Sequence, residues 1–284
     1  MTSPSQKQQP RKAFLTGVSG GIGGAMAELL LSEGWEVWGT ARAEKGWQSF
    51  APQKSFHGLQ LDLENKQQSL ATFADAWQHA GGFDLIINNA GYGVFSPLAD
   101  VNEDKLDRQV AAMIANTASL IRTQTIALRG QGGGTMVNVS SLAVEFPLPF
   151  MSGYNMAKAA MSALSESLMM ELSGSAVVVI DFRPGDIKTG FNQVMSPNAE
   201  TVIADSSRGN LAATWRVLEK NIQTAPPAET AARSMWRAVQ NGRSGIVRCG
   251  GFFQARLAPV LIRLMPERLA RAIRWRYFGL KQGG

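Results

Sequence analysis

The chain has 284 residues but only one cysteine and two histidines. Because Cys249 is alone, it cannot form an internal disulfide, and we expect a reducing, cytoplasmic compartment and a structural role for this thiol. His57 and His79 stand far from other ligand-type residues, since metal sites gather several such side chains. The sequence therefore predicts no metal site.

Long apolar runs are also missing. No stretch approaches the roughly 18 apolar residues that a membrane-spanning helix needs. The first residues lack a charged-then-apolar leader with a cleavage site, so we expect neither secretion nor a membrane span. Met1 to Pro10 is polar, and we predict a disordered tail over residues 1–10.

Net charge is nearly absent from most of the chain. The whole protein has a formal charge of +6, and the segment from Phe252 to Gly284 alone carries seven basic residues against one acidic residue. The remaining residues are thus formally neutral. A nucleic-acid-binding protein needs a basic face on its folded body, so we expect no nucleic-acid partner.

Alternation of strand-like and helical stretches predicts the fold class. Apolar residues make up 45% of the chain, and helical stretches separate seven strand-like runs, at 12–16, 35–40, 57–62, 83–88, 135–140, 176–182 and 245–248. Such alternation is typical of α/β proteins, whose parallel sheet is covered by helices on both faces. A chain of this length with this pattern is expected to form a single domain.

A glycine-rich turn follows the first predicted strand. Gly17-Val-Ser-Gly-Gly21-Ile-Gly23 comes directly after Thr16, and good helix formers run from Ala25 to Leu31. Glycine allows tight backbone turns and close approach of a ligand, while a helix N-terminus offers unpaired N–H groups to an anion. The segment therefore predicts a pyrophosphate-binding strand–turn–helix unit.

Tyr154 and Lys158 are four residues apart on a predicted helix, so they project from one face. A lysine ammonium beside a phenol is expected to lower the phenol's pKa, which would make Tyr154 an acid and base near neutral pH. The spacing is also common in ordinary amphipathic helices. Only its combination with other motifs favours chemistry.

Five motifs occur together in one order. They are Thr16 to Gly23 (T-G-x-x-x-G-x-G), Asn88 to Gly91 (N-N-A-G), the strand Val137-Asn-Val-Ser-Ser141, Tyr154 to Lys158 (Y-x-x-x-K) and Pro184 to Thr189 (P-G-x-x-x-T). In this respect the chain, from about Arg11 to about Thr189, resembles the compact branch of the short-chain dehydrogenase/reductase family.

The resemblance implies a Rossmann-like doubly wound parallel sheet with helices on both faces. We expect a dinucleotide-binding catalytic body at residues 11–250, a substrate lid within it at 187–224, and a basic amphipathic helical extension at 251–284. Long apolar helices near Met113 to Leu128 and Met156 to Leu172 resemble the family's interface helices, which implies a homo-oligomer, a dimer or tetramer.

Arg42 is the residue that predicts the cofactor. The second predicted strand ends without the acidic residue that binds a free adenosine ribose, and Ala41-Arg42 follows. A guanidinium there can pair with a 2′-phosphate, which favours NADP(H) over NAD. The alternative is a solvated surface arginine.

The resemblance also implies the remaining cofactor contacts. Asp62 matches the family's aspartate at the adenine, and Asn89 to Gly91 match the segment beside the ribose, while Asn88 is expected to bridge strands. The other expected cofactor residues lie in the glycine turn, in Tyr154-to-Lys158 and after the sixth strand: Gly17, Ser19, Gly21, Ile22, Gly23, Tyr154, Lys158, Pro184, Gly185, Ile187 and Thr189.

Four residues carry the predicted catalysis. Hydride transfer to a carbonyl leaves alkoxide charge, so the site needs a hydrogen-bond donor and a proton source at that oxygen. We expect Tyr154 to donate the proton, Lys158 to tune Tyr154 and bind the nicotinamide ribose, and Ser141 to orient the substrate. Ser140 is expected to brace the loop. Asn116 matches the family's water-holding asparagine of a proton relay; the alternative is an ordinary polar helix residue.

One departure from the family pattern lies after the serines. The segment Leu142-Ala-Val-Glu-Phe-Pro147 lacks the glycine that often occurs there. The local loop shape is therefore not predicted, although no catalytic group is lost.

Apolar residues flank the predicted site on two sides and predict a lipophilic or bulky substrate. They are Phe191, Val194, Met195, Val202 and Trp215 in the lid, and Phe146, Leu148, Phe150 and Met151 opposite. The same residues could serve lid packing alone, which would leave a small polar substrate open.

The extension combines arginines with Trp275, Tyr277 and Phe278, in two helical pieces separated near Pro266. This composition resembles an interfacial membrane anchor, which would make the protein peripheral on a membrane. The alternative is a helix packed across the substrate mouth or against another subunit.

Three classes of protein compete for this sequence. An NADP(H)-dependent oxidoreductase that interconverts a carbonyl and a secondary alcohol fits every motif. A catalytically silent cofactor-binding regulator would not need Ser141, Tyr154 and Lys158 together. An epimerase of the extended branch would need wider glycine spacing and a larger C-terminal domain. We therefore predict the oxidoreductase.

Overall fold

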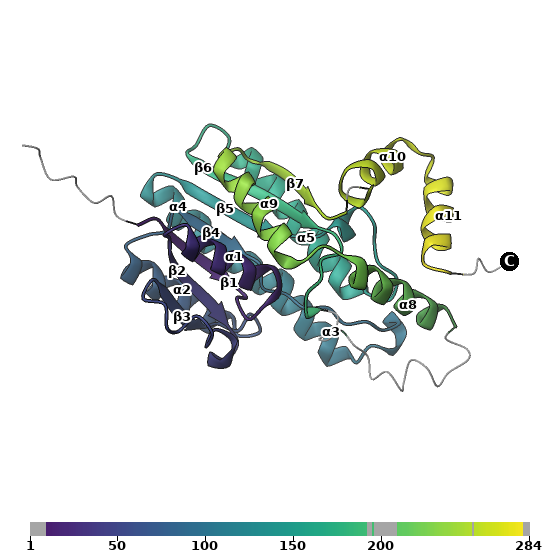
Figure 1. The fold of residues 1–284 in the computed structure, drawn as a ribbon, viewed down its shortest axis with the longest axis horizontal. Coiled ribbons are helices and arrows are strands. Elements are labelled where there is room, and N and C mark those ends of the chain that lie inside the picture. The colour runs from purple at the N-terminus through teal and green to yellow at the C-terminus, as the bar shows by residue number, and fades with distance from the viewer. Residues whose placement is uncertain (1–9, 192–194, 196–208, 252, 281–284) are drawn as a thin grey trace, which may run out of the picture.

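The computed structural model describes residues 10–191, 195, 209–251 and 253–280 (Figure 1). Within these residues, seven strands form one parallel sheet in the order β3-β2-β1-β4-β5-β6-β7. The strands are β1 (Lys12–Thr16), β2 (Glu36–Ala41), β3 (Phe56–Gln60), β4 (Leu85–Asn88), β5 (Gly134–Val139), β6 (Val177–Pro184) and β7 (Gly245–Cys249). The predicted α/β fold with a doubly wound parallel sheet is confirmed. The predicted tail at 1–10 lies, except for Pro10, outside the described residues.

Both faces of the sheet are buried, which explains why its strands are apolar without alternation. In β1, Ala13 and Leu15 pack into the cluster on one face, whereas Phe14 packs into the cluster on the other. Ile86 and Ile87 divide in the same way in β4. Successive side chains of a strand point to opposite faces of the sheet, so each strand contributes apolar residues to both cores.

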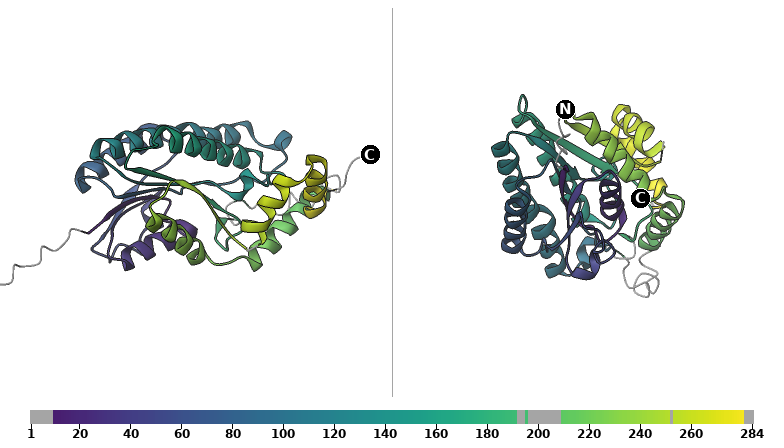
Figure 2. Two further views of the ribbon diagram at one scale, coloured as in Figure 1. Left: turned by 90° about the horizontal axis from the view of Figure 1, so that it is seen from above. Right: turned by 60° about the vertical axis from the view of Figure 1, so that its left-hand side comes forward.

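Helices form the outer two layers (Figure 2). The helix α1 (Gly21–Ser32) and α9 (Ala228–Asn241) pack on each other and on one face of the sheet. The opposite face is covered by α2 (Lys66–Ala80), α4 (Thr117–Gln131) and α5 (Ser152–Glu171). Two further helices, α3 (Glu103–Val110) and α8 (Gly209–Thr224), lie toward the end of the molecule where the extension packs (Figure 1).

The helix expected over Leu106 to Arg129 is interrupted. A π-helical turn, Ala111–Asn116, separates α3 from α4. The Thr117 hydroxyl donates to the Ala112 carbonyl oxygen at 2.8 Å, five residues earlier, which stabilises the wider turn. Such turns change the direction in which the neighbouring side chains point.

The extension is helical, as predicted. After β7 come a π-helical turn (Phe253–Leu257), α10 (Ala258–Leu264) and α11 (Glu267–Tyr277), with Pro266 at the start of the last helix. Its Phe278 is buried in a cluster with Tyr154, Met195 and Leu218. The extension therefore packs on the body at the end of α5 that carries Tyr154. None of the described helices has the length and hydropathy needed to cross a bilayer.

All strands run in one direction, so their carboxyl ends meet at one edge of the sheet. Strand order reverses between β1 and β4, where the chain leaves β1 toward β2 on one side and β4 continues toward β5 on the other. In open α/β sheets, ligands bind beyond the carboxyl ends of the strands at such a switch point. The site is expected there.

Candidate active site

A cavity of about 800 Å³ opens at the carboxyl edge of the sheet. Its walls come from the β1–α1 turn, the ends of β2 to β6, α5, α8 and the extension. Most of the residues that the sequence predicted for the site line it, and the exceptions are Gly23 and Asn116.

The glycine turn has the backbone that its sequence requires. Gly17 and Gly21 have φ angles of 78° and 57°, which favour glycine. Gly20 stands at the N-terminus of α1, where no side chain caps the helix and no acidic residue occupies the first turn. The helix start therefore has free N–H groups and a positive partial charge at the cavity.

Gly23 has a different role from the one predicted. It does not line the cavity, and a Cβ at this position would lie 2.0 Å from the Gly17 carbonyl oxygen. This glycine lets α1 pack closely on the turn. Its contribution to ligand binding is therefore indirect, through the shape of the turn.

Arg42 and Asp62 lie beyond the ends of β2 and β3, and both line the cavity. Arg42 is exposed and forms no ion pair with another described residue. The Asp62 side chain accepts a hydrogen bond from the Glu64 backbone N–H at 3.0 Å, so its own loop holds the carboxylate. Arg42 is thus free to meet an anion.

At the end of β4, one asparagine bridges neighbouring elements and the next lines the cavity. Asn88 is buried and donates to Asn138 of β5 at 2.9 Å and to Gln124 of α4 at 2.8 Å, so it bridges two elements as expected. The Asn89 amide donates to the Thr16 and Gly17 carbonyl oxygens at 3.1 and 3.0 Å. Asn89 therefore lines the cavity while its amide stabilises the glycine turn.

Small residues keep the cavity floor open near the sheet. Ala90 and Gly91 line it, and a Cβ on Gly17 would lie 2.9 Å from the Ala90 Cα. Lys158 lies close by, since its Nζ would be 3.5 Å from a Cβ on Gly91. The backbone at this point is thus accessible from the cavity.

The segment after β6 approaches the glycine turn from the other side. The Gly185 N–H donates to the Cys249 carbonyl oxygen at 2.7 Å, which ties the Pro184-Gly185 turn to β7. Thr189 lies near Gly21, with its Cβ 3.3 Å from a Cβ placed on that glycine. Ile187 is buried and, like Thr189, lines the cavity. These contacts bring the two predicted phosphate-binding segments together.

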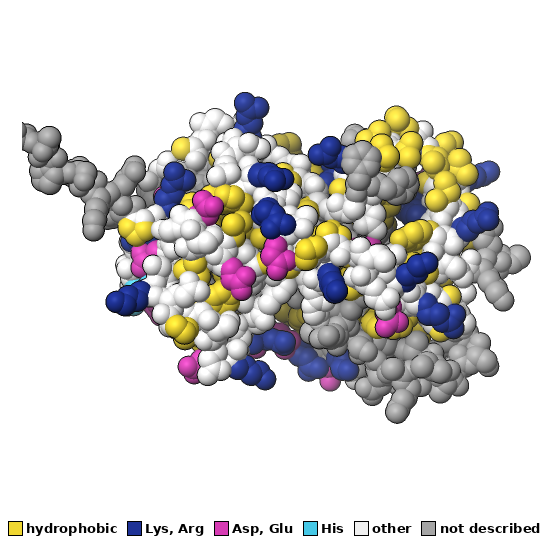
Figure 3. Space-filling model, in the orientation of Figure 1, with side chains coloured by type: hydrophobic (Ala, Val, Ile, Leu, Met, Phe, Trp, Pro, Cys, Tyr) yellow, Lys and Arg dark blue, Asp and Glu magenta, His cyan; other side chains and the backbone are white. Residues whose placement is uncertain are grey.

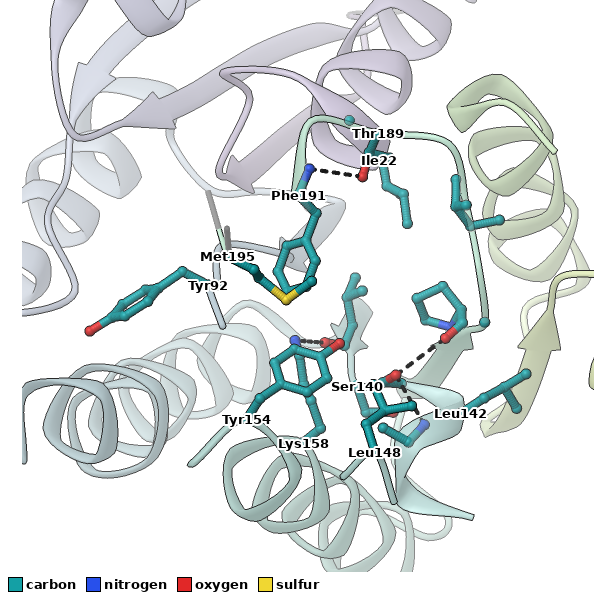
Figure 4. A pocket seen from close by; sticks show the side chains of 18 of the residues that line it. Ile22, Tyr92, Ser140, Leu142, Leu148, Tyr154, Lys158, Thr189, Phe191 and Met195 are labelled. Atoms are coloured by element: carbon teal, nitrogen blue, oxygen red, sulfur yellow. Dashed lines mark hydrogen bonds between the residues drawn. The ribbon is translucent and has the colours of Figure 1, made fainter. Parts of the chain in front are cut away.

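Tyr154 and Lys158 project side by side from α5 into the cavity (Figure 4). Both are buried, with 8% and 5% of their surface exposed, and the Lys158 Nζ lies 5.7 Å from the centre of the Tyr154 ring. The Lys158 ammonium donates to the Val139 carbonyl oxygen at 2.7 Å. The predicted shared face of the helix is therefore observed.

The pKa of Tyr154 differs from the expectation. Burial raises it above its ordinary value, a hydrogen bond with Ser141 lowers it, and the nearby Asp186 carboxylate raises it. Burial also lowers the pKa of Lys158 to about 8, against a smaller raising effect of Asp181. The expected lowering of the tyrosine pKa by the lysine is thus wrong for the protein alone, because desolvation dominates both groups.

The two serines have separate partners. Ser141 is buried, its hydroxyl accepts from the Ala143 N–H at 3.0 Å, and it bonds to Tyr154. Ser140 turns its hydroxyl to the Asp181 carboxylate. Ser141 is therefore placed beside the tyrosine, whereas Ser140 braces the strand end.

A buried ion cluster supports the loop that lacks the family's glycine. Arg183, with 5% of its side chain exposed, pairs with Asp181 at 2.8 Å, Glu145 at 2.7 Å and Glu166 at 2.9 Å. Glu145 belongs to the loop after the serines, where residues Leu142–Val144 form a short 3₁₀ turn. Ion pairs between side chains thus hold this loop in place, although it lacks the glycine that often occurs there.

Asn116 lies outside the cavity lining. It ends the π-helical turn, and its amide donates to the Leu63 carbonyl oxygen at 2.7 Å. The sequence placed it on a regular helix, whereas the wider turn directs its side chain to the loop after β3. The side chain therefore does not join Tyr154 and Lys158.

Apolar side chains cover the tyrosine end of the cavity. The Phe191 ring lies 5.5 Å from the Tyr154 ring, and Met195 lies beside it (Figure 4). Of the apolar residues predicted opposite, Phe146, Leu148 and Met151 line the cavity; Phe150 does not line it, and its ring packs against Phe95. Val194 and Val202 lie outside the described residues, and Trp215 packs on Phe95 at 5.0 Å.

Sequence reasoning missed a polar group in this apolar wall. Asp186 lines the cavity, accepts from the Gln254 amide at 2.6 Å and bonds to Asn221 of α8. Asn221 in turn donates to the Tyr277 hydroxyl at 2.7 Å. Burial raises the pKa of Asp186. Asp186 sits inside the P-G-x-x-x-T motif, but Gln254 and Asn221 belong to no motif, so no local signal identifies them.

Comparison with known proteins agrees with this geometry. Residues 11–200 match the family model described as short chain dehydrogenase. An uncharacterized oxidoreductase of Schizosaccharomyces pombe is 30% identical over 62% of this chain and 60% of its own length. A protein named 3-ketodihydrosphingosine reductase from Bacteroides thetaiotaomicron is 27% identical over 64% of this chain and 66% of its own length.

A solved structure shows the same fold over nearly the whole chain. The short chain dehydrogenase/reductase of Burkholderia phymatum, crystallised in complex with NAD, superposes with a TM-score of 0.77 at 24% identity, covering 93% of this chain and 95% of that one. The curated relatives above align over less than two thirds of their own lengths, so no whole-protein activity follows from them. The chain belongs to the short-chain dehydrogenase/reductase family of oxidoreductases.

Proposed function

We propose that the protein is an NADP(H)-dependent oxidoreductase that interconverts a carbonyl and a secondary alcohol on a lipophilic substrate. One observation carries this proposal: Ser141, Tyr154 and Lys158 meet in a single cavity that also contains the glycine turn and Arg42. A site for chemistry and a site for an anionic dinucleotide are thus continuous.

The residues present fit a dinucleotide. The uncapped start of α1 offers N–H groups to a pyrophosphate, and a Cβ on Gly17 would fill the space beside Ala90. Ser19, Gly21, Ile22 and Thr189 would surround the phosphates, Asp62 the adenine, and Asn89 to Gly91 with Lys158 the ribose next to the nicotinamide. Pro184, Gly185 and Ile187 would hold the nicotinamide end.

Within this site, the protein's own groups handle the proton. The bound nicotinamide would supply or accept the hydride. Ser141 would orient the carbonyl oxygen and Tyr154 would protonate it, since the two hydroxyls are hydrogen-bonded. Lys158, held by the Val139 carbonyl, would stabilise the tyrosinate once its proton has left.

The proposed role of Asn116 in a proton relay is limited by the contact that its side chain already makes. Its side-chain amide already donates to the Leu63 carbonyl. A water that relays protons toward Lys158 would therefore have to bind the main chain of Asn116 or its side-chain oxygen. The π-helical turn in which Asn116 lies is a common feature of functional sites.

Arg42 supports NADP(H) as the cofactor. It is an exposed guanidinium at the cavity, and the end of β2 carries no carboxylate for a free ribose hydroxyl. The similar Burkholderia phymatum protein was crystallised with NAD, so the fold alone does not select the nucleotide. The choice for this chain rests on Arg42.

A lipophilic substrate is supported by the apolar wall near Tyr154. Phe191, Met195 and Leu148 surround the phenol, and Asp186 gives the wall one polar group. The name of the 27% identical relative, 3-ketodihydrosphingosine reductase, denotes a ketone with a long alkyl chain. We therefore favour an amphipathic ketone or alcohol over a small polar one.

We also propose a homo-oligomer and a cytoplasmic location. Ile126 of α4 and Met156 and Met170 of α5 are exposed on the helices predicted to form the interface. The reducing compartment remains the prediction from the lone cysteine.

The test is cofactor titration followed by turnover. The purified protein should bind NADPH more tightly than NADH and should oxidise NADPH when given a long-chain ketone, with short ketones reacting more slowly. Tighter binding of NADH would overturn the cofactor assignment. NADPH binding without oxidation across long, short and aromatic ketones would favour the cofactor-binding regulator instead.

A further inference from the structure

The extension exposes an apolar surface next to the cavity. In the turn before α10 and in α10 itself, Leu257, Val260, Leu261 and Leu264 have exposed fractions between 45% and 80%. Their spacing of three, one and three residues places them on one side of a helix. Leu269 and Ile273 of α11, four residues apart, are exposed by 51% and 45%. We name these six residues the apolar rim.

The apolar rim continues into the cavity. Leu261 and Ile273 belong to the rim and also line the cavity, and so does Tyr277, which is 50% exposed. A side chain that is half exposed and lines a cavity lies at its mouth. An apolar path therefore runs from the outer surface of α10 and α11 toward the Tyr154 end of the cavity.

Arginines surround this apolar surface. Arg268, Arg271 and Arg276 on α11 are exposed, and the extension as a whole carries seven basic residues against one acidic residue. Figure 3 shows the hydrophobic side chains gathered over α10 and α11 with Lys and Arg side chains at their margin. Trp275 is 38% exposed on the same helix, and a partly exposed indole suits the boundary between water and acyl chains.

We propose that the apolar rim and its arginines dock on an anionic lipid bilayer, so that an amphipathic carbonyl lipid enters the cavity directly from the membrane. Charge complementarity selects this occupant: the chain outside the extension is formally neutral, and the excess positive charge surrounds the apolar rim. A second copy of the chain would bring an equal set of arginines against the first. The docking step stands on the surface alone, while the entry of substrate rests on the proposed function.

The extension is fixed to the body in a way that suits this role. Tyr277 accepts a hydrogen bond from Asn221 of α8, and Phe278 is buried with 4% of its surface exposed. Tyr277 and Phe278 thus hold the C-terminal end of α11 on the body, while Leu269 and Ile273 remain exposed. Packing across the mouth and contact with a membrane are therefore compatible, although the sequence presented them as alternatives.

Vesicle flotation of the full-length protein tests the docking. We expect binding to vesicles of equimolar phosphatidylcholine and phosphatidylglycerol, weak binding to phosphatidylcholine alone, and release by salt. The double variant Leu264→Ser, Leu269→Ser should lower the affinity at least tenfold, because two exposed leucines lose their transfer into the acyl region. The matched control is Leu98→Ser in the body, which is 56% exposed and should bind as the wild type does.

Charge reversal tests the arginines separately. Arg268→Glu with Arg276→Glu should weaken binding to anionic vesicles roughly fivefold or more for each residue. Arg237→Glu, an exposed arginine of α9 on the body, is the control and should have little effect. Equal losses from both sets would mean that total charge, and not this surface, drives binding, and would overturn the proposal.

Turnover separates the docking from the chemistry. The Leu264→Ser, Leu269→Ser variant should oxidise NADPH normally with a short water-soluble ketone and at least fivefold more slowly with a long-chain ketone held in anionic vesicles. No vesicle binding by the wild type at low salt would overturn the proposal. If light scattering shows that the wild type is a dimer and that Leu264→Ser with Leu269→Ser makes it a monomer, the surface binds a second copy of the chain and the proposal is wrong. Vesicle binding without any NADPH oxidation would instead refute the proposed function alone.

Discussion

The body and the extension place their large hydrophobic side chains in opposite environments. In the described chain, eight of the thirteen large hydrophobic residues that are exposed belong to the extension, although the extension is far shorter than the body. The charges are divided in a similar way, since residues 1–251 are formally neutral and residues 252–284 carry the whole excess of +6. The body thus buries most of its large hydrophobic side chains in its own cores, whereas the extension leaves eight of them exposed.

The same substitution, leucine to alanine, can be made in both regions to test this difference in burial. Leu30 of α1 is fully buried and Leu264 of α10 is 80% exposed, and both lie in helices. Leu30→Ala should lower the free energy of unfolding by about 2–5 kcal/mol, because it removes packed methyl groups and leaves a cavity. Urea unfolding followed by tryptophan fluorescence measures it. A loss below about 1 kcal/mol would contradict the packed core described for the body.

The next largest effect is expected from Lys158, on the pH dependence of the free energy of unfolding. Burial lowers its pKa from 10.5 to about 8, so between these values the unfolded chain holds a proton that the folded chain does not. The free energy of unfolding should therefore rise with pH across this window, by on the order of 3 kcal/mol in total. Below about pH 8 the buried lysine is charged, and its full destabilising effect should be present. The Lys158→Met variant should lack this rise. The same pH dependence in both proteins would show that Lys158 keeps an ordinary pKa.

Arg42 is an exposed cation of the body, and its proposed ligand is the 2′-phosphate of NADPH. A charge-assisted pair with a 2′-phosphate is worth about 1.5–3 kcal/mol, and about 1.4 kcal/mol is tenfold in affinity. Arg42→Ala should weaken NADPH about tenfold or more and change NADH little. Fluorescence titration with both nucleotides measures this, and Arg237→Ala on α9 is the control. Equal weakening of both nucleotides would contradict the phosphate contact.

The smallest effect is expected in the extension. Leu264→Ala should change the free energy of unfolding by less than about 0.5 kcal/mol, because the side chain is already in water. The measurement is the same urea unfolding as for Leu30→Ala. A loss of 2 kcal/mol or more, as in a core, would show that the extension buries this residue in solution, for example against a second copy.

The sheet could be predicted from the sequence almost strand for strand. Because its strands are buried on both faces, each is a short apolar run, and β1 was placed at Lys12–Thr16 as observed. Glycine turns and the Y-x-x-x-K spacing are equally local, and Gly17, Tyr154 and Lys158 all line the cavity.

What could not be predicted depends on contacts between distant segments. Asn116 was expected on a regular helix, but a bond from Thr117 to Ala112 stabilises a wider turn that redirects it. Asp186 acquires its partner from Gln254, 68 residues later, which no spacing rule reports. The pKa of Tyr154 depends on the depth of burial, and burial follows from packing of the whole domain.

The role of Tyr154 is tested most directly by comparing wild type with Tyr154→Phe, each mixed with saturating NADPH and a long-chain ketone. The phenol is the proposed proton donor, and phenylalanine keeps the ring that packs on Phe191. We predict nearly unchanged NADPH affinity and a loss of turnover on the order of 10²-fold or more, since general acid catalysis contributes about 10²–10⁴-fold. Turnover within a few-fold of wild type in the phenylalanine variant would contradict the assigned chemistry.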